Sequence, residues 1–358
     1  MRTKVVAFTP HLKECGIGHR RRVGAIAAKN KDILEFFFFS PTLNSSITKH
    51  DLSAESSGII FGWRHLKRDL ENWSRQRVKI RFLIDLSNVI MVRYVHYFEE
   101  ILRRTQHLAG AVILIDSVKQ ESFRRFFSVF LSKTIIPYVL DDVTLESINK
   151  EDEIFYCGKD YIVTGLIDIG HQAGCFPVRK PELGKTEDHS KKIGIALGGH
   201  SFEQTVKLVE WLVFSEHSGN YQILIALAGD DEIATRSVIS KIFKNANRKP
   251  PVFLEFSKNF YFSLKDCFFC FVGPGLLKYE ALQMGINFAV VVNDEDGLKL
   301  NENFAKFSKS KVIKLNCINE GCNFGSLVQT LKQNPPNEKS QRAFIFDGAK
   351  RIGELINE

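Results

Sequence analysis

The chain has 358 residues, of which 44% are hydrophobic and 25% are charged, a balance that predicts two globular domains with sizeable cores. No apolar run reaches the roughly 18 to 20 residues that cross a bilayer, and the first ten residues lack the apolar core of a signal peptide, so we expect a cytoplasmic protein without an integral membrane segment. The net charge of +8 suits an anionic ligand, but the basic residues are scattered and resemble no nucleic-acid-binding module, which argues against a nucleic-acid partner.

In the first half of the chain, short apolar runs alternate with amphipathic stretches. The runs lack clean polar alternation, as is typical of parallel strands covered on both faces. The predicted strands are residues 4–10, 33–40, 58–63, 79–87, 111–117 and 134–142. The predicted helices between them include residues 19–30, 93–105 and 119–131. This repeated alternation predicts a doubly wound parallel sheet, in which the run Phe36–Phe39 is a buried strand and not a binding patch.

A polar segment with two prolines then interrupts the pattern, and we interpret it as a linker. A second α/β series follows, with predicted strands at 192–199, 221–229, 251–256, 267–273, 287–292 and 311–315 and a last helix at 341–356. The predicted domains are an N-terminal Rossmann-like domain at 1–178, a linker at 179–191, a C-terminal Rossmann-like domain at 192–334 and a C-terminal helical segment at 335–358 that packs back on the first domain. Two such domains in tandem predict an interdomain cleft, because open α/β sheets bind ligands at the carboxyl ends of their strands.

The seven cysteines are dispersed, which argues against a disulfide framework. Cys267 and Cys270 form a C-x-x-C pair, but they lie in an apolar run that predicts a strand, where residues three apart point to opposite faces. We therefore favour a buried-core role over metal binding. The acidic run Asp230–Glu232 precedes a predicted helix, where acids favour the positive end of the dipole. No metal or other cofactor is expected.

The turn after the first strand, Cys15-Gly16-Ile17-Gly18-His19, leads into a helix. Its glycines allow close approach of a ligand, and free amides at the helix start favour an anion. Arg21 occupies the third glycine position of the dinucleotide fingerprint, which disfavours dinucleotide binding. His19 is a candidate general base, although the turn alone is equally compatible with a histidine that only caps the helix.

A second glycine turn, Gly198-Gly199, follows the first strand of the second domain. Two glycines before a helix give a geometry that suits phosphate. An ordinary turn capped by Ser201 is an equally good interpretation when the motif is considered alone.

A third turn, Gly273-Pro274-Gly275, precedes a short helix that starts near Leu276. Backbone amides at this start could hold a diphosphate, and Glu280, one turn further, could accept both hydroxyls of a ribose. The alternative is that Glu280 is only a solvated surface acid.

Together, these motifs and their order resemble the UDP-sugar hydrolases of pseudaminic acid biosynthesis, which have a glycosyltransferase-B fold. The family's G-x-G-H-x-x-R turn is matched by Gly16, Gly18, His19 and Arg22, and its N-domain aspartates by Asp116 and Asp141–Asp142. Residues 156–163 match the segment before the linker, and Gly198 and Gly199 match the second glycine turn. The G-x-x-x-x-E helix is matched by Gly275 and Glu280, and the late D-G-x-x-A-x-R signature appears in shortened form as Asp347–Arg351.

The resemblance implies metal-independent, inverting attack of water on the anomeric carbon of a UDP-activated amino sugar. His19 would activate the water, and Asp116 would be the second catalytic residue. The remaining residues that the resemblance assigns to the substrate are Gly16, Gly18, Arg22, Gly198, Gly199, Gly275, Leu276, Glu280 and Asn303. The partner is a UDP-sugar, and the protein would be a monomer or a weak oligomer.

The chain departs from the family pattern at several positions. Leu276 and Leu277 replace the usual hydroxyl residues, so phosphate contacts would fall to backbone amides and to Lys278. Ser117 and Val118 replace a His-Tyr type pair, and an expected Asn-Gln pair is represented at best by Asn301–Asn303 or Asn293. An inverting UDP-sugar-dependent transferase with an unknown acceptor and a non-catalytic nucleotide-sugar binder therefore remain alternatives.

Overall fold

A computed structural model of the chain describes residues 2–9, 18–40, 58–86, 88–115, 128–140, 145–146, 155–163, 191–198, 201–216, 218–227, 232–255, 260–316, 323–333, 338–342, 344 and 346–358. The chain divides into two compact units. The first unit is Met1–Ile167 together with Ile345–Glu358, and the second is Asp168–Phe344. The predicted linker at 179–191 lies outside the described residues except for Lys191.

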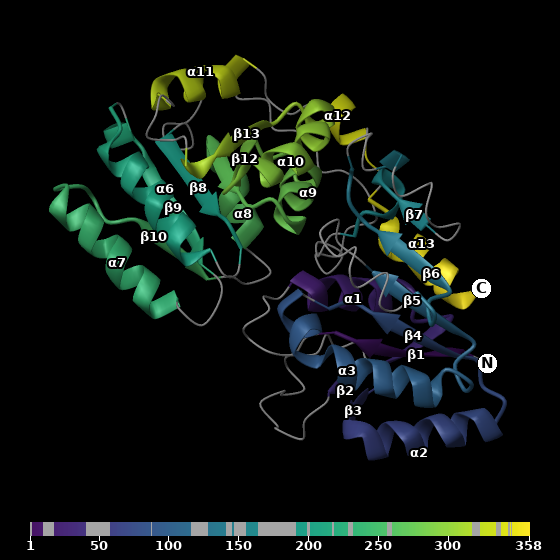
Figure 1. Cartoon of the computed structure of the whole chain (residues 1–358). Coiled ribbons are helices and arrows are strands. Elements are labelled where there is room, and N and C mark those ends of the chain that lie inside the picture. The colour runs from purple at the N-terminus through teal and green to yellow at the C-terminus, as the bar shows by residue number, and fades with distance from the viewer. Residues whose placement is uncertain are drawn as a thin grey trace. The chain divides into compact units, whose positions relative to one another are not determined.

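The first unit is built on a seven-stranded sheet whose strands are all paired in parallel, in the order β3-β2-β1-β4-β5-β6-β7 (Figure 1). The strands are β1 (Thr3–Phe8), β2 (Leu34–Ser40), β3 (Gly58–Phe61), β4 (Ile80–Ile84), β5 (Ala111–Ile115), β6 (Lys133–Ile136) and β7 (Phe155–Cys157). The helices are α1 (Gly18–Lys29), α2 (Gly62–Arg75), α3 (Asn88–Thr105) and α13 (Gly348–Asn357).

Each face of this sheet carries its own apolar core. Phe39 belongs to the core shared with α2 and α3, whereas Phe36 and Phe38 belong to the core shared with α1 and α13. The strand that contains these residues, β2, lies between β3 and β1. The predicted buried strand is therefore confirmed, because successive side chains of an interior strand enter opposite hydrophobic layers.

The second unit repeats the same architecture with a six-stranded parallel sheet in the order β10-β9-β8-β11-β12-β13. The strands are β8 (Lys192–Ala196), β9 (Gln222–Leu227), β10 (Val252–Glu255), β11 (Phe269–Val272), β12 (Phe288–Val292) and β13 (Lys311–Lys314). The helices are α6 (Phe202–Phe214), α7 (Glu232–Asn245), α8 (Phe260–Lys265), α9 (Leu276–Gln283), α10 (Glu295–Ser308), α11 (Phe324–Gln333) and α12 (Glu338–Arg342).

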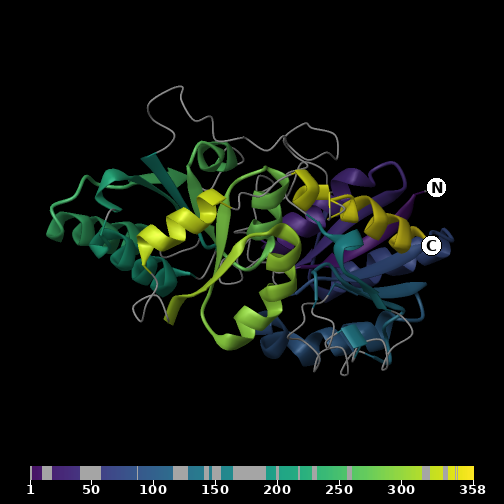
Figure 2. The same ribbon diagram turned by 90° about the horizontal axis from the view of Figure 1, so that it is seen from above.

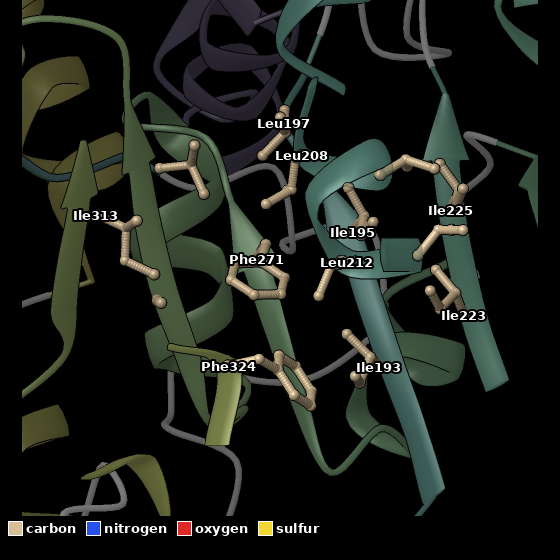
Figure 3. Packing of buried hydrophobic residues seen from close by; sticks show 14 of the residues in the cluster. Ile193, Ile195, Leu197, Leu208, Leu212, Ile223, Ile225, Phe271, Ile313 and Phe324 are labelled. Carbon is tan, nitrogen blue, oxygen red and sulfur yellow. The ribbon is translucent and has the colours of Figure 1, made fainter. Parts of the chain in front are cut away.

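The core on one face of the second sheet joins strand residues to α6, α7 and α11. Figure 3 shows Ile193, Ile195 and Phe271 of β8 and β11 packed with Leu212 of α6 and Phe324 of α11. The rings of Phe269 and Phe271 meet edge to face at a centroid distance of 5.1 Å. The two predicted glycine turns of the second unit directly follow β8 and β11, two of the strands in this buried layer.

The C-terminal segment does not form the single helix that we predicted at 341–356. The chain forms α12 in the second unit and α13 in the first, with residues 346–347 outside both helices. A Cβ on Gly348 would lie 2.3 Å from the backbone carbon of Tyr161, so only glycine fits at the first residue of α13.

Helix α13 packs lengthwise against α1, as both views show for the yellow and purple helices (Figures 1 and 2). Asn30 Nδ2 donates to the carbonyl of Ala349 at 2.9 Å, and a Cβ at Gly353 would lie 2.0 Å from the Asn30 side chain. Thr3 Oγ1 donates to Asn357 Oδ1 at 2.7 Å, which ties β1 to the last turn of α13. Within the described residues, no helix is long and apolar enough to cross a membrane.

Candidate functional site

Each sheet has one position where the strand order reverses. In the first unit the reversal falls between β1 and β4, and in the second it falls between β8 and β11. Open α/β sheets bind ligands just beyond the carboxyl ends of the strands at such a switch point. The residues that follow these four strands are therefore the candidates for binding and chemistry.

At the first switch point, His19 is the second residue of α1, whose first residue is Gly18. Its Nδ1 lies 2.7 Å from Oδ1 of Asp85, the residue that directly follows β4. The pairing of β1 with β4 extends to Asp85, whose backbone N–H donates to the carbonyl of Phe8, the last residue of β1, at 2.9 Å. The His19 side chain is 23% exposed, whereas that of Asp85 is fully buried.

Arg22 lies one turn after His19 and binds the same carboxylate with two nitrogens. Nε donates to Asp85 Oδ2 at 2.8 Å, and Nη2 donates to Asp85 Oδ1 at 2.7 Å. Nη1 donates to the hydroxyl of Tyr138, which follows β6, at 2.8 Å. This paired, charge-assisted geometry is one of the stronger hydrogen-bonding arrangements in proteins.

The ion pair sets the charge of both groups. Burial by itself would raise the pKa of Asp85, but the positive charge of Arg22, the neighbouring His19 and the hydrogen bonds from both lower that pKa to about 2. Burial opposes the charge of Arg22, but Asp85 and Tyr138 outweigh it and raise the pKa of the guanidinium. Asp85 is therefore a carboxylate and Arg22 a cation throughout the physiological range.

These contacts correct the expectation for Arg22. The resemblance assigned Arg22 to the substrate, but all three nitrogens of its guanidinium are bound to Asp85 and Tyr138. Its contacts make it a support for the buried carboxylate. Gly16 and Asp116 lie outside the described residues, as does the pair 141–142, so their assignments stay predictions.

At the second switch point, the two predicted glycine turns lie side by side. The N–H of Gly273, directly after β11, donates to the carbonyl of Ala196, the last residue of β8, at 3.0 Å. A Cβ on Gly273 would lie 2.1 Å from the carbonyl oxygen of Leu197, so this close approach requires glycine. A Cβ on Gly198 would lie 3.6 Å from Cδ1 of Leu277 on α9.

The first of these turns needs a glycine for its backbone conformation. Gly198 has a φ of +97°, in a region that residues with a Cβ rarely adopt. Ser201 precedes α6, but its hydroxyl donates back to the Gly198 carbonyl at 2.6 Å and makes no capping bond to the helix amides. The structure therefore contradicts the interpretation of this turn as one capped by the Ser201 side chain. Gly199 lies outside the described residues.

The second turn leads into α9, which begins at Leu276 after the exposed Gly275. Gly275 has no side chain that could cap the first-turn amides, which leaves the positive end of the helix dipole open to an anion. Glu280, one turn further, is only 2% exposed, which rules out the interpretation as a solvated surface acid. The predicted Leu276 and Glu280 thus belong to the short helix that directly follows the glycine turn.

Lys278 does not extend from this helix to a phosphate position, contrary to what the altered turn predicted. It is 3% exposed, its Nζ donates to Asn301 Oδ1 on α10 at 2.6 Å, and it lies 4.8 Å from the centroid of the Phe304 ring. Burial lowers the pKa of this amine to about 7, so the amine is only partly protonated near neutral pH. Its hydrogen bond to Asn301 joins α9 to α10. Asn303, predicted to contact the substrate, lies two residues beyond Asn301 on α10.

The cysteine pair has a structural role. Cys270 is fully buried in β11, and burial raises the pKa of its thiol well above the usual value. Cys267 precedes the strand, so the expected opposite orientation is wrong: both sulfur atoms approach Gly194, at 2.5 and 3.3 Å from the position a Cβ would take there. Within the part of the chain that the structure describes, no three His, Cys, Asp or Glu side chains gather as a metal site.

Solved structures match the chain along nearly its whole length. No protein-family model and no curated protein matches it. The lipopolysaccharide outer core galactosyltransferase WaaB, in its apo form, matches with a TM-score of 0.59 at 10% identity over 99% of both chains. Anabaena Alr3699/HepE in complex with UDP matches with a TM-score of 0.60 at 10% identity over 99% of both chains. UDP-GlcNAc 2-epimerase from Neisseria meningitidis, bound to UDP-GlcNAc, matches with a TM-score of 0.59 at 12% identity over 99% of this chain and 100% of that one.

Identities this low establish the fold and nothing more. The chain has the two-unit, parallel-sheet α/β fold of glycosyltransferase-B enzymes and of the UDP-GlcNAc 2-epimerases.

Proposed function

We propose that the protein hydrolyses a UDP-activated amino sugar at its anomeric carbon and releases UDP, as a step in nonulosonic acid biosynthesis of the pseudaminic type. The observation that carries the proposal is His19 at the β1/β4 switch point, with one ring nitrogen held by a buried carboxylate and the side chain partly exposed. A histidine held in this way is suited to take a proton from water.

At the anomeric carbon, one C–O bond forms and one breaks, while a proton passes from water to His19. A water oxygen attacks the anomeric carbon while His19 accepts a proton from that water. The bond from the anomeric carbon to the β-phosphate oxygen breaks, and its electron pair leaves with UDP. Attack on the face opposite the leaving group inverts the anomeric configuration.

The proposed nucleotide-binding residues lie in the second unit. The diphosphate would lie at the amides of Gly275 and Leu276, where the start of α9 stabilises the negative charge that grows on the leaving group. Glu280 would accept hydrogen bonds from the ribose hydroxyls. Structures with the same fold were solved with UDP, with UDP-glucose and with UDP-GlcNAc, which supports a UDP-sugar as the ligand.

A transferase is the second candidate, because proteins with the same fold include a galactosyltransferase and MurG. The same donor site and the same base would then activate an acceptor hydroxyl in place of water. The net charge of +8 would favour an acceptor at an anionic surface.

The test is UDP release from a panel of UDP-diacetamido-sugars and UDP-N-acetylhexosamines, with the sugar product identified by NMR. Release of UDP and of a free sugar with inverted anomeric configuration, without any added acceptor, is the expected result. Release that requires an added acceptor would establish the transferase, and a UDP-linked epimer as the product would overturn both readings.

The substitution Glu280→Gln tests the nucleotide side. We expect it to weaken UDP binding by about tenfold or more, because a hydrogen bond to a charged group contributes about 1.5–3 kcal/mol. Calorimetry with UDP and with 2′-deoxy-UDP measures this effect. The wild type should lose affinity for the deoxy ligand, whereas Glu280→Gln should discriminate much less between the two ligands.

The matched control is Glu295→Gln, because Glu295 is an exposed glutamate in the same unit that binds Lys314. It should bind both ligands as the wild type does. Equal affinities of wild type and Glu280→Gln for UDP would exclude a contact between Glu280 and the ribose.

A further inference from the structure

We propose that Asp85 is the positioning residue of the reaction: it fixes the proton of His19 on Nδ1 and leaves Nε2 as the proton acceptor, while Arg22 keeps Asp85 ionised. This inference rests on the proposed function, which assigns the base but not the group that orients it. It also differs from the expectation that Asp116 is the catalytic carboxylate.

The distances around Nδ1 of His19 decide the tautomer. Asp85 Oδ1 lies at 2.7 Å and Arg22 Nη2 at 3.3 Å from this nitrogen. An ionised carboxylate can only accept a hydrogen bond, so the short contact requires a proton on Nδ1. An unprotonated Nδ1 would place two acceptors 2.7 Å apart inside the protein, which is repulsive. Arg22 Nη2 is then a neighbour of the ring and donates to Asp85.

Arg22 explains why the proton stays on the histidine. Its two hydrogen bonds and its charge hold the pKa of Asp85 near 2, although burial acts in the opposite direction. A carboxyl group that acidic does not take the Nδ1 proton when Nε2 becomes protonated. Asp85 therefore stabilises the imidazolium by charge and direction, without itself acting as an acid or base.

The burial of the three groups defines their roles. Asp85 is completely buried and Arg22 almost so, and only His19 retains exposed side-chain surface. Asp85 therefore acts on a substrate through His19 alone. The arrangement also needs three separate elements, because Asp85 follows β4, His19 and Arg22 lie on α1, and Tyr138 follows β6.

The decisive variant is Asp85→Asn, which keeps the size of the side chain but removes its charge. We expect kcat to fall by about 10²–10⁴-fold with little change in KM, because the base loses its orientation while the nucleotide site in the second unit is untouched. UDP affinity, measured by calorimetry, should stay within about twofold of the wild type, since no group of the second unit is altered.

Glu35→Gln is the matched control. Glu35 on β2 pairs with Lys4 on β1 at 2.7 Å, so the variant removes a partly buried carboxylate charge from the same sheet without touching His19. It should retain wild-type kcat. A fall in kcat of similar size in Glu35→Gln would show that any loss of charge in this sheet disturbs activity, and would overturn the specific role of Asp85.

An NMR measurement separates the failure of this inference from failure of the proposed function. Ring ¹⁵N shifts of the ten histidines, with His19 assigned by its absence in His19→Ala, report the tautomer without any turnover. The wild type should show a proton on Nδ1 of His19, and Asp85→Asn should lose this preference. If no donor is hydrolysed but the Nδ1 proton is found, the proposed function fails and only the orientation of His19 by Asp85 stands. A proton on Nε2 in the wild type, or full kcat in Asp85→Asn, overturns the positioning role.

Discussion

Replacement of His19 by alanine is expected to lower kcat for UDP release by about 10²–10⁴-fold, the usual contribution of a positioned general base. The residue is the partly exposed member of the buried network at the β1/β4 switch point, so no described neighbour could take over its proton transfer. Initial rates of UDP release at saturating donor measure the effect. Because the proposed nucleotide site lies in the second unit, UDP binding by the variant should remain.

His65→Ala provides the control for a histidine deletion. His65 is exposed on α2, where its Nδ1 donates to the carbonyl of Phe61 at 2.7 Å. The control should turn over like the wild type. Undiminished hydrolysis by His19→Ala would remove His19 from the chemistry, and with it the reaction that we propose.

Replacing Arg22 with methionine should destabilise the first unit by about 3–5 kcal/mol, the typical cost of leaving a buried charge without its partner. The substitution retains most of the apolar side chain but removes both bonds to Asp85 and the bond to Tyr138. Hydrogen exchange measures the loss locally. Amides of β1 and β4 should lose protection, whereas those of β8 and β11 in the second unit serve as the internal reference.

The ion pair also predicts how the destabilisation by Arg22→Met changes with pH. In the wild type the pKa of Asp85 lies below its unfolded value of about 3.8, so its stabilisation is complete above that pH and is lost as pH falls toward 2. Without Arg22, burial dominates and favours the protonated carboxyl, so the deficit of Arg22→Met should be smaller at pH 5 than at pH 8. The control Arg68→Met removes an exposed arginine from α2 and should change protection little. A deficit below about 1 kcal/mol for Arg22→Met would show that the ion pair does not hold the site together.

The fold could be predicted because its signals are local. Apolar runs without polar alternation marked the strands, and the structure confirms parallel sheets in both units. The seventh strand of the first unit, β7, was missed since it is only three residues long and offers little periodicity. The break between α12 and α13 was missed because the two helices belong to different units, a division that no local pattern in the sequence reveals.

The candidate site was only partly predictable from the sequence. Glycine turns and a histidine at a helix start are local patterns, and they led to His19, Gly198 and Gly275. Asp85 was overlooked although it lies in the strand predicted at 79–87, because nothing in the sequence states that β4 lies beside β1. Arg22 was assigned to the substrate for the same reason: its partner, Asp85, is 63 residues away along the chain. The strand order would have been sufficient to bring both to one switch point.

The return of α13 to the first unit affects the order in which the chain can fold during synthesis. Ile352, Leu355 and Ile356 belong to the same apolar core as α1, and burial of each contributes about 1.5–3 kcal/mol. A ribosome that has made the first 344 residues has synthesised every residue of the second unit, but not the helix that covers α1. The N-terminal unit, although translated first, is therefore completed only after α13 has been made, and the apolar face of α1 that α13 covers stays open until then.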